Sequence, residues 1–408
     1  MSFSEVILMA VPAVVRSATR PGGECSGARL PSLTGLRFVA AALVFAAHAS
    51  FVFPSRDPAV AGDFAHVAAQ GGPVGVGFFF VLSGFVLTWT ARRTDTAGRF
   101  WRRRAAKIFP NHLITWLAAL ILMIRAGQAV TAGTALPNLL LINSWVPKAS
   151  WVNSMNDVSW SLACEAFFYL MFPLVHRLVA RIPERCLWPS AAVVVAIVFI
   201  LPSVALLLPD QPMFVFAPMR QLWFVYFLPP VRLLDFVLGC LMARIVRAGR
   251  WIPVGTFPAV LLAAVAYAVS LHTPPLYSAA AVMLVPLAFV VAAAADSDLR
   301  ARRSLLRHRA LVWLGEISFA FYMVHHLVIR FAGGALGLGG KWGIVAASAV
   351  VVAVCVVSVL VAWLLYALVE RPAMRWSAGA GTDRVGVLVQ PESPGETSTS
   401  SSRAWSNE

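Results

Sequence analysis

The sequence predicts an all-α, polytopic membrane protein with about ten transmembrane helices and both termini in the cytoplasm. Of its 408 residues, 59% are hydrophobic and only 12% are charged, whereas soluble domains carry about a quarter charged residues. The mean hydropathy is +0.77. Apolar runs of membrane-spanning length recur along the chain, and the basic residues gather in short clusters between them, as in membrane-protein loops.

Ten segments are apolar enough to cross a bilayer, for which a helix needs about 20 residues. The second and third are short, and two prolines, Pro229 and Pro230, blur the start of the sixth. The apolar stretch 134–146 is too short to cross and is expected to be re-entrant or interfacial. In chain order the predicted spans are 34–53, 74–90, 109–126, 159–180, 188–208, 222–243, 252–271, 277–295, 310–333 and 343–369.

The distribution of Lys and Arg predicts the orientation of these spans, because cytoplasmic loops retain an excess of both. The two terminal segments and every second loop carry three to seven basic residues each, and the alternate loops carry one or none. This alternation supports the count of ten and places both termini inside. The formal net charge of +15 therefore reflects membrane topology, and no nucleic-acid partner is expected.

Three regions are predicted: an N-terminal cytoplasmic segment (1–30), a membrane domain (31–376) and a disordered cytoplasmic tail (377–408) rich in Ser, Thr, Gly and Glu. The apolar run 6–15 lacks a basic flank and a clear cleavage site, so a cleaved signal peptide is not expected. The five cysteines are odd in number and lack motif spacing. They predict neither a disulfide framework nor a metal site.

The first span holds two ionisable residues, Arg37 and His48. They are eleven residues apart, about three helical turns, so they share a face and lie about 16 Å apart along the axis. Ionisable groups at membrane depth are functional candidates by default. The alternative is an arginine that reaches the headgroups and a histidine bonded to a neighbouring helix.

A second basic group precedes the third span, at Arg102, Arg103, Arg104 and Lys107. Such a run commonly only enforces topology or contacts anionic lipid. However, Arg104 and Lys107 are three residues apart and share a helix face. If that face points inward, both can bind phosphates beside Arg37.

The fourth span carries Glu165, about two turns inside its outer boundary. His48 lies at a comparable depth in the first span, so Glu165 can orient the imidazole and stabilise its cation. A bond from Glu165 to a neighbouring helix is the equally weighted alternative.

In the ninth span, Tyr322 and His325 share one face. They either line a pocket or lock two helices together, and the second role is slightly favoured. Asp235 follows Arg232 by three residues, which favours a structural ion pair, and Glu370 with Arg371 is also interpreted as structural.

Six motifs occur in order over about residues 31–376. The first is Arg37 followed by ten residues and His48. The other five are GVGFFFVLSGF at 75–85, WSLACE at 160–165, RLLDFVLG at 232–239, the segment 318–325 and YALVERP at 366–372. Together they resemble the acyltransferase-3 family of integral membrane O-acyltransferases. The resemblance implies transfer of acetyl or other short acyl groups from coenzyme A thioesters to hydroxyls, as in O-antigen acetylases and macrolide acyltransferases.

The resemblance and the residues together imply a mechanism of direct transfer. Arg37, Arg104 and Lys107 would hold the phosphates of acyl-CoA, the donor substrate, by charge-assisted bonds. His48 would act as general base on the acceptor hydroxyl, oriented by Glu165. No permanently bound cofactor and no metal are expected; the partners are acyl-CoA, a hydroxylated acceptor and the lipid bilayer of a bacterial cell membrane.

The sequence departs from the family pattern in three places. Lys107 replaces the second arginine of an Arg-x-x-Arg motif, keeping the charge but losing the bidentate fork. Phe319 stands where the family often has tyrosine. The chain ends soon after the tenth predicted helix, so the extra extracytoplasmic domain of some carbohydrate-modifying members is not expected.

The acceptor and the class of protein each have alternatives. The LPSLTGLR opening and the Ala/Val/Arg-rich composition look like antibiotic-tailoring actinomycete members, which favours a macrolide-type polyketide or its sugar. An envelope polysaccharide or glycolipid is the second choice.

A transporter would use Arg37, His48 and Glu165 for passage of a substrate or proton, but no internal repeat is found. A structural or lipid-binding protein is the last alternative.

Overall fold

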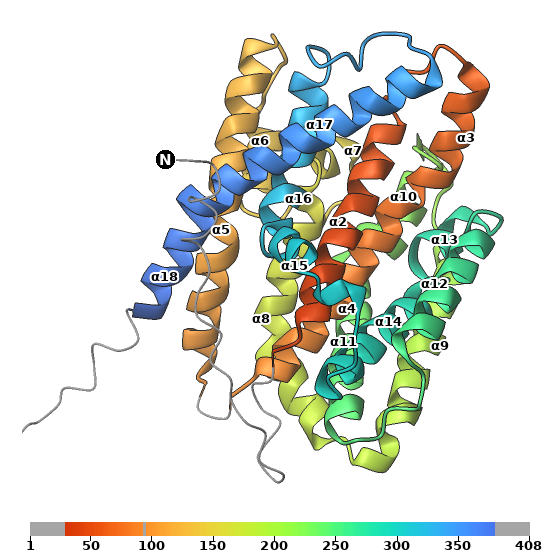
Figure 1. The fold of residues 1–408 in the computed structure, drawn as a ribbon, viewed down its shortest axis with the longest axis vertical. Coiled ribbons are helices and arrows are strands. Elements are labelled where there is room, and N and C mark those ends of the chain that lie inside the picture. Colours follow the sequence, from red (N-terminus) through yellow and green to blue (C-terminus); the bar gives the residue numbers. More distant parts are fainter. Residues whose placement is uncertain (1–28, 93–94, 380–408) are drawn as a thin grey trace, which may run out of the picture.

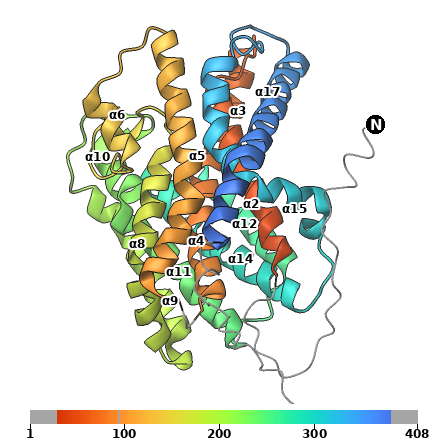
Figure 2. The ribbon, with the colours of Figure 1, turned by 90° about the vertical axis from the view of Figure 1, so that its left-hand side faces the viewer.

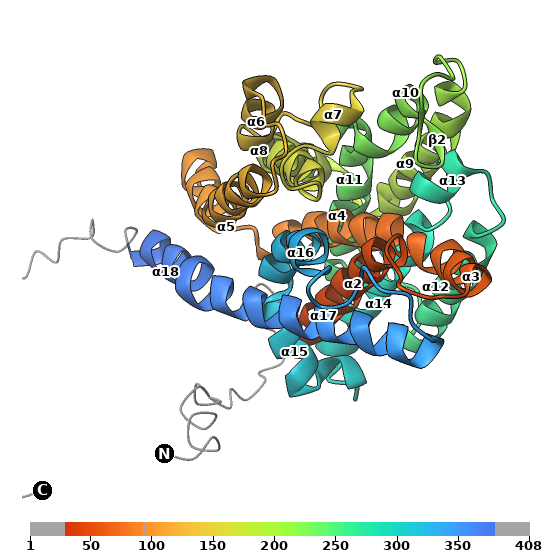
Figure 3. The same cartoon turned by 90° about the horizontal axis from the view of Figure 1, so that it is seen from above.

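The computed structural model describes residues 29–92 and 95–379. These residues form a bundle of helices, with one short antiparallel strand pair, β1 (Met213–Phe214) and β2 (Ala217–Pro218) (Figures 1 and 2). Seen from above, α2, α4 and α16 lie in the middle, surrounded by α5, α8, α9, α12 and α17 (Figure 3). The predicted all-α class is confirmed. The predictions for 1–28 and 380–408 fall outside the described residues.

The helices have the following bounds: α2 Pro31–Ser50, α3 Pro58–Ala69, α4 Gly71–Thr90, α5 Ala97–Arg125, α6 Ala132–Leu139, α7 Ala149–Val152, α8 Ser159–Arg181, α9 Leu187–Ala205, α10 Met219–Leu222, α11 Pro229–Arg247, α12 Thr256–Ser270, α13 Pro275–Ala280, α14 Leu284–Leu299, α15 Arg309–Glu316, α16 Ser318–Leu327, α17 Ile344–Leu365 and α18 Arg371–Gly379. Single 3-10 turns lie at Glu184–Cys186 and Leu305–Arg307, and π-helical turns lie at Trp223–Phe227, Val328–Ala332 and Tyr366–Glu370.

The described part of the chain contains eight helices long and apolar enough to cross a membrane, or nine if a bent pair counts as one span. The bent pair is α15 with α16 and its extension, which meet at 63°; it corresponds to the predicted ninth span. The predicted seventh span is α12, which has only 15 residues and a length of about 22 Å. It is shorter than expected because the helix begins after Pro253 and Gly255, at Thr256.

Two further boundaries differ from the prediction. The second span is longer, because α3 and α4 follow one another with only Gln70 between them and together form a 33-residue helical segment, Pro58–Thr90. The third begins at Ala97, where the Thr96 side chain accepts a hydrogen bond from the backbone nitrogen of Arg99. The basic run is therefore helical.

The stretch 134–146 overlaps α6, whose eight residues are too short to span, as expected.

The loops with many basic residues meet at one end of the bundle, here called the basic end, and the alternate loops meet at the opposite end. At the basic end, Arg244 donates a hydrogen bond of 2.9 Å to the carbonyl of Ile182 and so joins two basic loops. At the opposite end, the backbone nitrogen of Arg56 donates one of 2.8 Å to the carbonyl of Trp342. The alternation found in the sequence thus corresponds to a spatial separation of the loops.

Helices α4 and α11 cross at two glycines in the middle of the bundle. A Cβ on Gly84 would lie 1.9 Å from the carbonyl oxygen of Phe236, and a Cβ on Gly239 would lie 1.9 Å from that of Val81. The two backbones therefore approach too closely for any side chain, a typical use of small residues between membrane helices.

The substitution Gly84→Ala is expected to destabilise the protein by about 3 kcal/mol, because the clash is with rigid backbone rather than with a flexible side chain. Gly98→Ala is the matched control, since a Cβ on this helical glycine of α5 meets nothing within 4 Å. Thermal unfolding of both variants in detergent checks the prediction. Equal unfolding temperatures for the two would contradict this close packing.

Two groups predicted to be structural are found in structural contacts. Arg232 and Asp235 form an ion pair of 2.6 Å, and both side chains are only 2% exposed. The guanidinium also lies 5.3 Å over the ring of Phe80 on α4. Glu370 accepts a hydrogen bond of 2.7 Å from Asn111, which ties the end of the last span to α5.

Candidate active site

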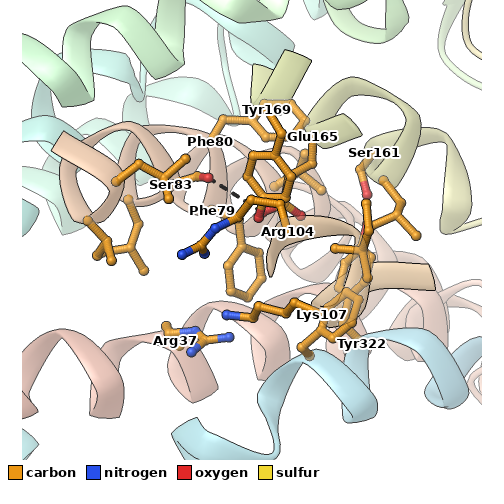
Figure 4. Close-up of a pocket in the computed structure, with 17 residues that line it drawn as sticks. Arg37, Phe79, Phe80, Ser83, Arg104, Lys107, Ser161, Glu165, Tyr169 and Tyr322 are labelled. Atoms are coloured by element: carbon orange, nitrogen blue, oxygen red, sulfur yellow. Dashed lines mark hydrogen bonds between the residues drawn. The ribbon is translucent and has the colours of Figure 1, made fainter. Parts of the chain in front are cut away.

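A pocket lies between α2, α4, α5, α8 and α16; it encloses about 860 Å³ of empty space, part of which is open to solvent. We call it the basic pocket, and Figure 4 shows the residues that line it. Arg37, Arg104 and Lys107 come from two different helices and project into the same space. The remaining polar lining residues are Ser83, Ser161, Glu165, Tyr169 and Tyr322.

Three polar residues of α8 that line the pocket are spaced four positions apart in the sequence. Ser161, Glu165 and Tyr169 are each one turn apart and so lie on one helix face. The Tyr169 hydroxyl donates a short hydrogen bond to Glu165, and the Ser83 hydroxyl donates a longer one of 3.4 Å from α4. Glu165 is therefore held by two hydroxyl groups inside the basic pocket.

The three cations of the pocket converge from two helices, whereas the spacing predicted only that Arg104 and Lys107 share a helix face. Arg104 and Lys107 share the inward face of α5, and Arg37 faces them from α2. The Arg104 guanidinium lies 5.6 Å over the ring of Phe100 and 5.8 Å over that of Tyr169, and its Nε atom is buried without a hydrogen-bond partner in the described chain. Glu165 in the lining and Glu370 beside it interact with these cations, but two carboxylates do not balance three cations, and the remaining positive charge favours an anionic ligand.

The predicted contact between His48 and Glu165 is not formed. The Nδ1 atom of His48 instead lies 3.0 Å from Nε2 of His325 on α16, and the His326 ring centroid is 4.7 Å from that of His48. The depth estimate was wrong because α2 ends at Ser50, so His48 lies in its last turn, whereas Glu165 is six residues into α8. Among the described residues, His48 is not one of those that line the basic pocket.

Tyr322 and His325 connect the pocket with His48. Tyr322 lines the pocket, and its hydroxyl lies 2.6 Å from the Ser161 hydroxyl. His325 is fully buried one turn further along α16, with its ring centroid 5.8 Å from that of Tyr322. Each of the two roles considered for this pair is therefore found in one residue. Tyr322 lines the pocket, and His325 connects two helices by its contact with His48.

Several residues of the site were missed from the sequence. The four-residue spacing of Ser161, Glu165 and Tyr169 is a signal that could have indicated the α8 wall. Ser83 and His326 carry no such local signal, because their partners lie far away in the chain. Among the described residues, no group of three or more His, Cys, Asp or Glu is arranged to hold a metal ion.

Beyond the histidines, at the opposite end of the bundle, Asp157 lies in the loop before α8. Its carboxylate is 3.8 Å from Nδ1 of His326 and 3.6 Å from Nη1 of Arg330. Burial raises the pKa of Asp157 to about 7, although the Arg330 guanidinium opposes the shift. A carboxyl whose pKa is raised on folding binds its proton more tightly in the folded state.

The stability contributed by protonated Asp157 should therefore be lost as the pH rises from about 4 through 7. We expect the unfolding temperature of the wild type to fall by about 3 °C more between pH 5 and pH 8 than that of Asp157→Asn, which stays neutral. Thermal unfolding in detergent across this range is the measurement, with Asp63→Asn, an exposed carboxylate on α3, as control. Parallel curves for the wild type and Asp157→Asn would refute the shift.

Comparison with known proteins agrees with this architecture. A family model described as an acyltransferase domain matches residues 30–367. The chain belongs to the acyltransferase-3 family of integral membrane O-acyltransferases. It is a multi-pass membrane enzyme that transfers an acyl group to a hydroxyl acceptor, and the transporter and structural alternatives are set aside.

Two relatives illustrate the range of similarity. The chain is 43% identical to the acyltransferase MdmB of Streptomyces mycarofaciens over 357 residues, which cover 85% of this chain and 92% of that protein. It is 23% identical to the peptidoglycan O-acetyltransferase OatA of Listeria monocytogenes over 329 residues, 74% of this chain. That match spans about half, 49%, of OatA. No solved structure matches the chain.

Proposed function

We propose that this enzyme transfers an acetyl or other short acyl group from acyl-CoA to a hydroxyl of a macrolide-type polyketide or its sugar. The observation that carries the proposal is the basic pocket, in which Arg37, Arg104 and Lys107 converge next to a chain of polar side chains that leads to His48. Coenzyme A has a long thiol arm and a polyanionic end, which match the two parts of this arrangement.

The donor would bind with its pyrophosphate among the three cations. Charge-assisted bonds from guanidinium and ammonium groups are the strong contacts for phosphates. Arg104 and Lys107 lie in the part of α5 nearest the basic end, so the nucleotide end of the donor enters from that side. The thiol arm then runs toward Tyr322, and Arg37 and His48 are about 16 Å apart along the α2 axis.

His48 is the proposed general base. Its Nδ1 faces His325, which fixes the ring and leaves Nε2 for the acceptor hydroxyl. His48 Nε2 accepts the hydroxyl proton, the acceptor oxygen attacks the thioester carbonyl, and the C–S bond breaks as the imidazolium returns its proton to the departing thiolate. His325 takes the orienting role first assigned to Glu165. Glu165 instead positions Tyr169 and offsets the charge of the cations.

The macrolide-type acceptor is favoured by the resemblance to antibiotic-tailoring actinomycete members, with which the pattern of similarity agrees. Identity is 43% to MdmB, a Streptomyces acyltransferase, over nearly that whole protein, and 23% to a peptidoglycan O-acetyltransferase. A cell-envelope polysaccharide or glycolipid is the second candidate, because the same hydroxyl chemistry applies and OatA is named for peptidoglycan.

The test is release of free coenzyme A by the purified, detergent-solubilised protein with acetyl-CoA or propionyl-CoA. The acceptor panel contains macrolides with and without their sugars and soluble peptidoglycan fragments. We expect release that depends on a macrolide acceptor and yields its O-acyl ester. Ester formation on peptidoglycan fragments alone would overturn the acceptor, and failure of folded protein to bind or cleave any acyl-CoA would overturn the donor.

A further inference from the structure

A second pocket adjoins the basic pocket at the basic end; it encloses about 890 Å³ of empty space, part of which is open to solvent. The two share Leu87 and Arg104 in their linings. The second pocket lies between the end of α4, the start of α5 and the last turns of α8. We call it the arginine pocket; its polar and aromatic lining residues are Thr90, Arg92, Asp95, Thr96, Phe100, Arg103, Arg104, Phe172, His176 and Arg177.

The charge of the arginine pocket is strongly positive, because four arginines and one aspartate line it. Arg103 donates hydrogen bonds of 3.0 Å and 2.6 Å to the two oxygens of Asp95. This bidentate pair fixes the loop before α5 and holds the pKa of the Asp95 carboxyl below its usual range. The other three guanidinium groups exceed the available carboxylate charge and favour an anionic ligand.

The floor of the arginine pocket is aromatic. The ring centroids of Phe100 and Phe172 are 4.9 Å apart at 30°, and those of Phe172 and His176 are 5.3 Å apart at 31°. Two buried polar atoms here, Nδ1 of His176 and Nε of Arg104, have no hydrogen-bond partner among the described residues. Phe100 and Phe172 are buried, and His176 is the half-buried ring of this stack. A flat heterocycle fits such a surface, because it can stack on the imidazole ring of His176.

We propose that the arginine pocket binds the 3′-phosphorylated adenosine end of the acyl-CoA donor. This inference rests on the proposed function, in which the basic pocket takes the pyrophosphate and the thiol arm. Arg104, shared by both pockets, spans the junction between the nucleoside and the pyrophosphate. Arg177 and Arg92 bind the 3′-phosphate, and adenine stacks on His176, whose ring is supported from behind by Phe172.

Binding of donor fragments tests the proposal without knowledge of the acceptor. Coenzyme A, 3′-dephospho-coenzyme A and pantetheine are titrated against the protein in nanodiscs of phosphatidylcholine. The variants are Arg177→Gln and Arg92→Gln. Arg181→Gln is the matched control, because Arg181 is exposed one turn further along α8 and lies outside the arginine pocket.

We expect the wild type to bind coenzyme A about tenfold more tightly than its 3′-dephospho form, the lower end of what a hydrogen bond to a charged group provides. Arg177→Gln should lose this preference and leave the affinity for 3′-dephospho-coenzyme A and pantetheine unchanged. Arg181→Gln should behave as the wild type.

Two results would overturn the inference and leave the proposed function intact. In the first, coenzyme A binds but removing its 3′-phosphate or Arg177 changes nothing. In the second, the effect of Arg177→Gln appears only in nanodiscs with anionic lipid, which would assign the pocket to a phosphate headgroup. Failure of the wild type to bind any coenzyme A species would instead overturn the proposed donor.

Discussion

Replacing His48 by alanine is expected to lower kcat about 10²- to 10⁴-fold, the usual contribution of a general base, without weakening the binding of coenzyme A. The reason is geometric: His48 is held by His325 at 3.0 Å and lies outside the basic pocket. The measurement is the initial rate of acceptor-dependent coenzyme A release, together with the coenzyme A dissociation constant of the same preparation.

His48→Asn separates loss of the base from loss of packing. Its amide can keep a hydrogen bond to His325, but it cannot take a proton at neutral pH. The asparagine variant should therefore be as inactive as the alanine variant while unfolding at the wild-type temperature. His66→Ala, on an exposed part of α3, is the control. Wild-type turnover by either His48 variant would remove His48 from the mechanism.

Replacing Arg37 by glutamine is expected to weaken coenzyme A binding about 10- to 100-fold. Arg37 is the cation that α2 contributes to the basic pocket, and a hydrogen bond between charged partners is worth about 1.5–3 kcal/mol. Arg37→Lys should recover only part of the loss, because lysine keeps the charge but not the bidentate fork. Titration of coenzyme A against each variant measures the effect.

Arg125→Gln provides the control for Arg37→Gln, since it removes the same charge from the exposed last turn of α5. Its affinity for coenzyme A should equal that of the wild type. If both substitutions weaken binding equally, the effect is a general one of net charge. The assignment of Arg37 to the donor site would then be rejected.

The helical class and the cations of the site could be predicted because both depend on local patterns. Apolar runs identify membrane helices through their length. The three-residue spacing of Arg104 and Lys107 places both on one face of α5 without knowledge of any other helix. Ordered motifs then indicated the family, which the family model confirms over residues 30–367.

The partners of His48 and Glu165 could not be predicted, because they depend on helix ends and on contacts between distant segments. His48 and His325 are separated by 277 positions. The composition of the first span also gave no sign that α2 stops at Ser50 rather than at residue 53. An error of about one turn in depth was enough to pair His48 with the wrong side chain.

The bend in the ninth span likewise depends on a contact between distant segments. Hydropathy treats 310–333 as one uniform run, but the backbone turns by 63° between Glu316 and Ser318. A Cβ on Gly315 would lie 1.8 Å from the carbonyl oxygen of Thr34. The bend thus lies where α15 packs against the start of α2, a tertiary contact that the hydropathy of the run does not encode.

The central claim is that the acyl donor lies in the basic pocket and points its thioester toward His48. Its most direct test is a cryo-electron microscopy map of the full chain in nanodiscs with bound coenzyme A. The claim predicts density for the pyrophosphate among Arg37, Arg104 and Lys107, with the thiol arm directed past Tyr322 toward His48. Coenzyme A density elsewhere, with the basic pocket filled by lipid or side chains, would contradict it.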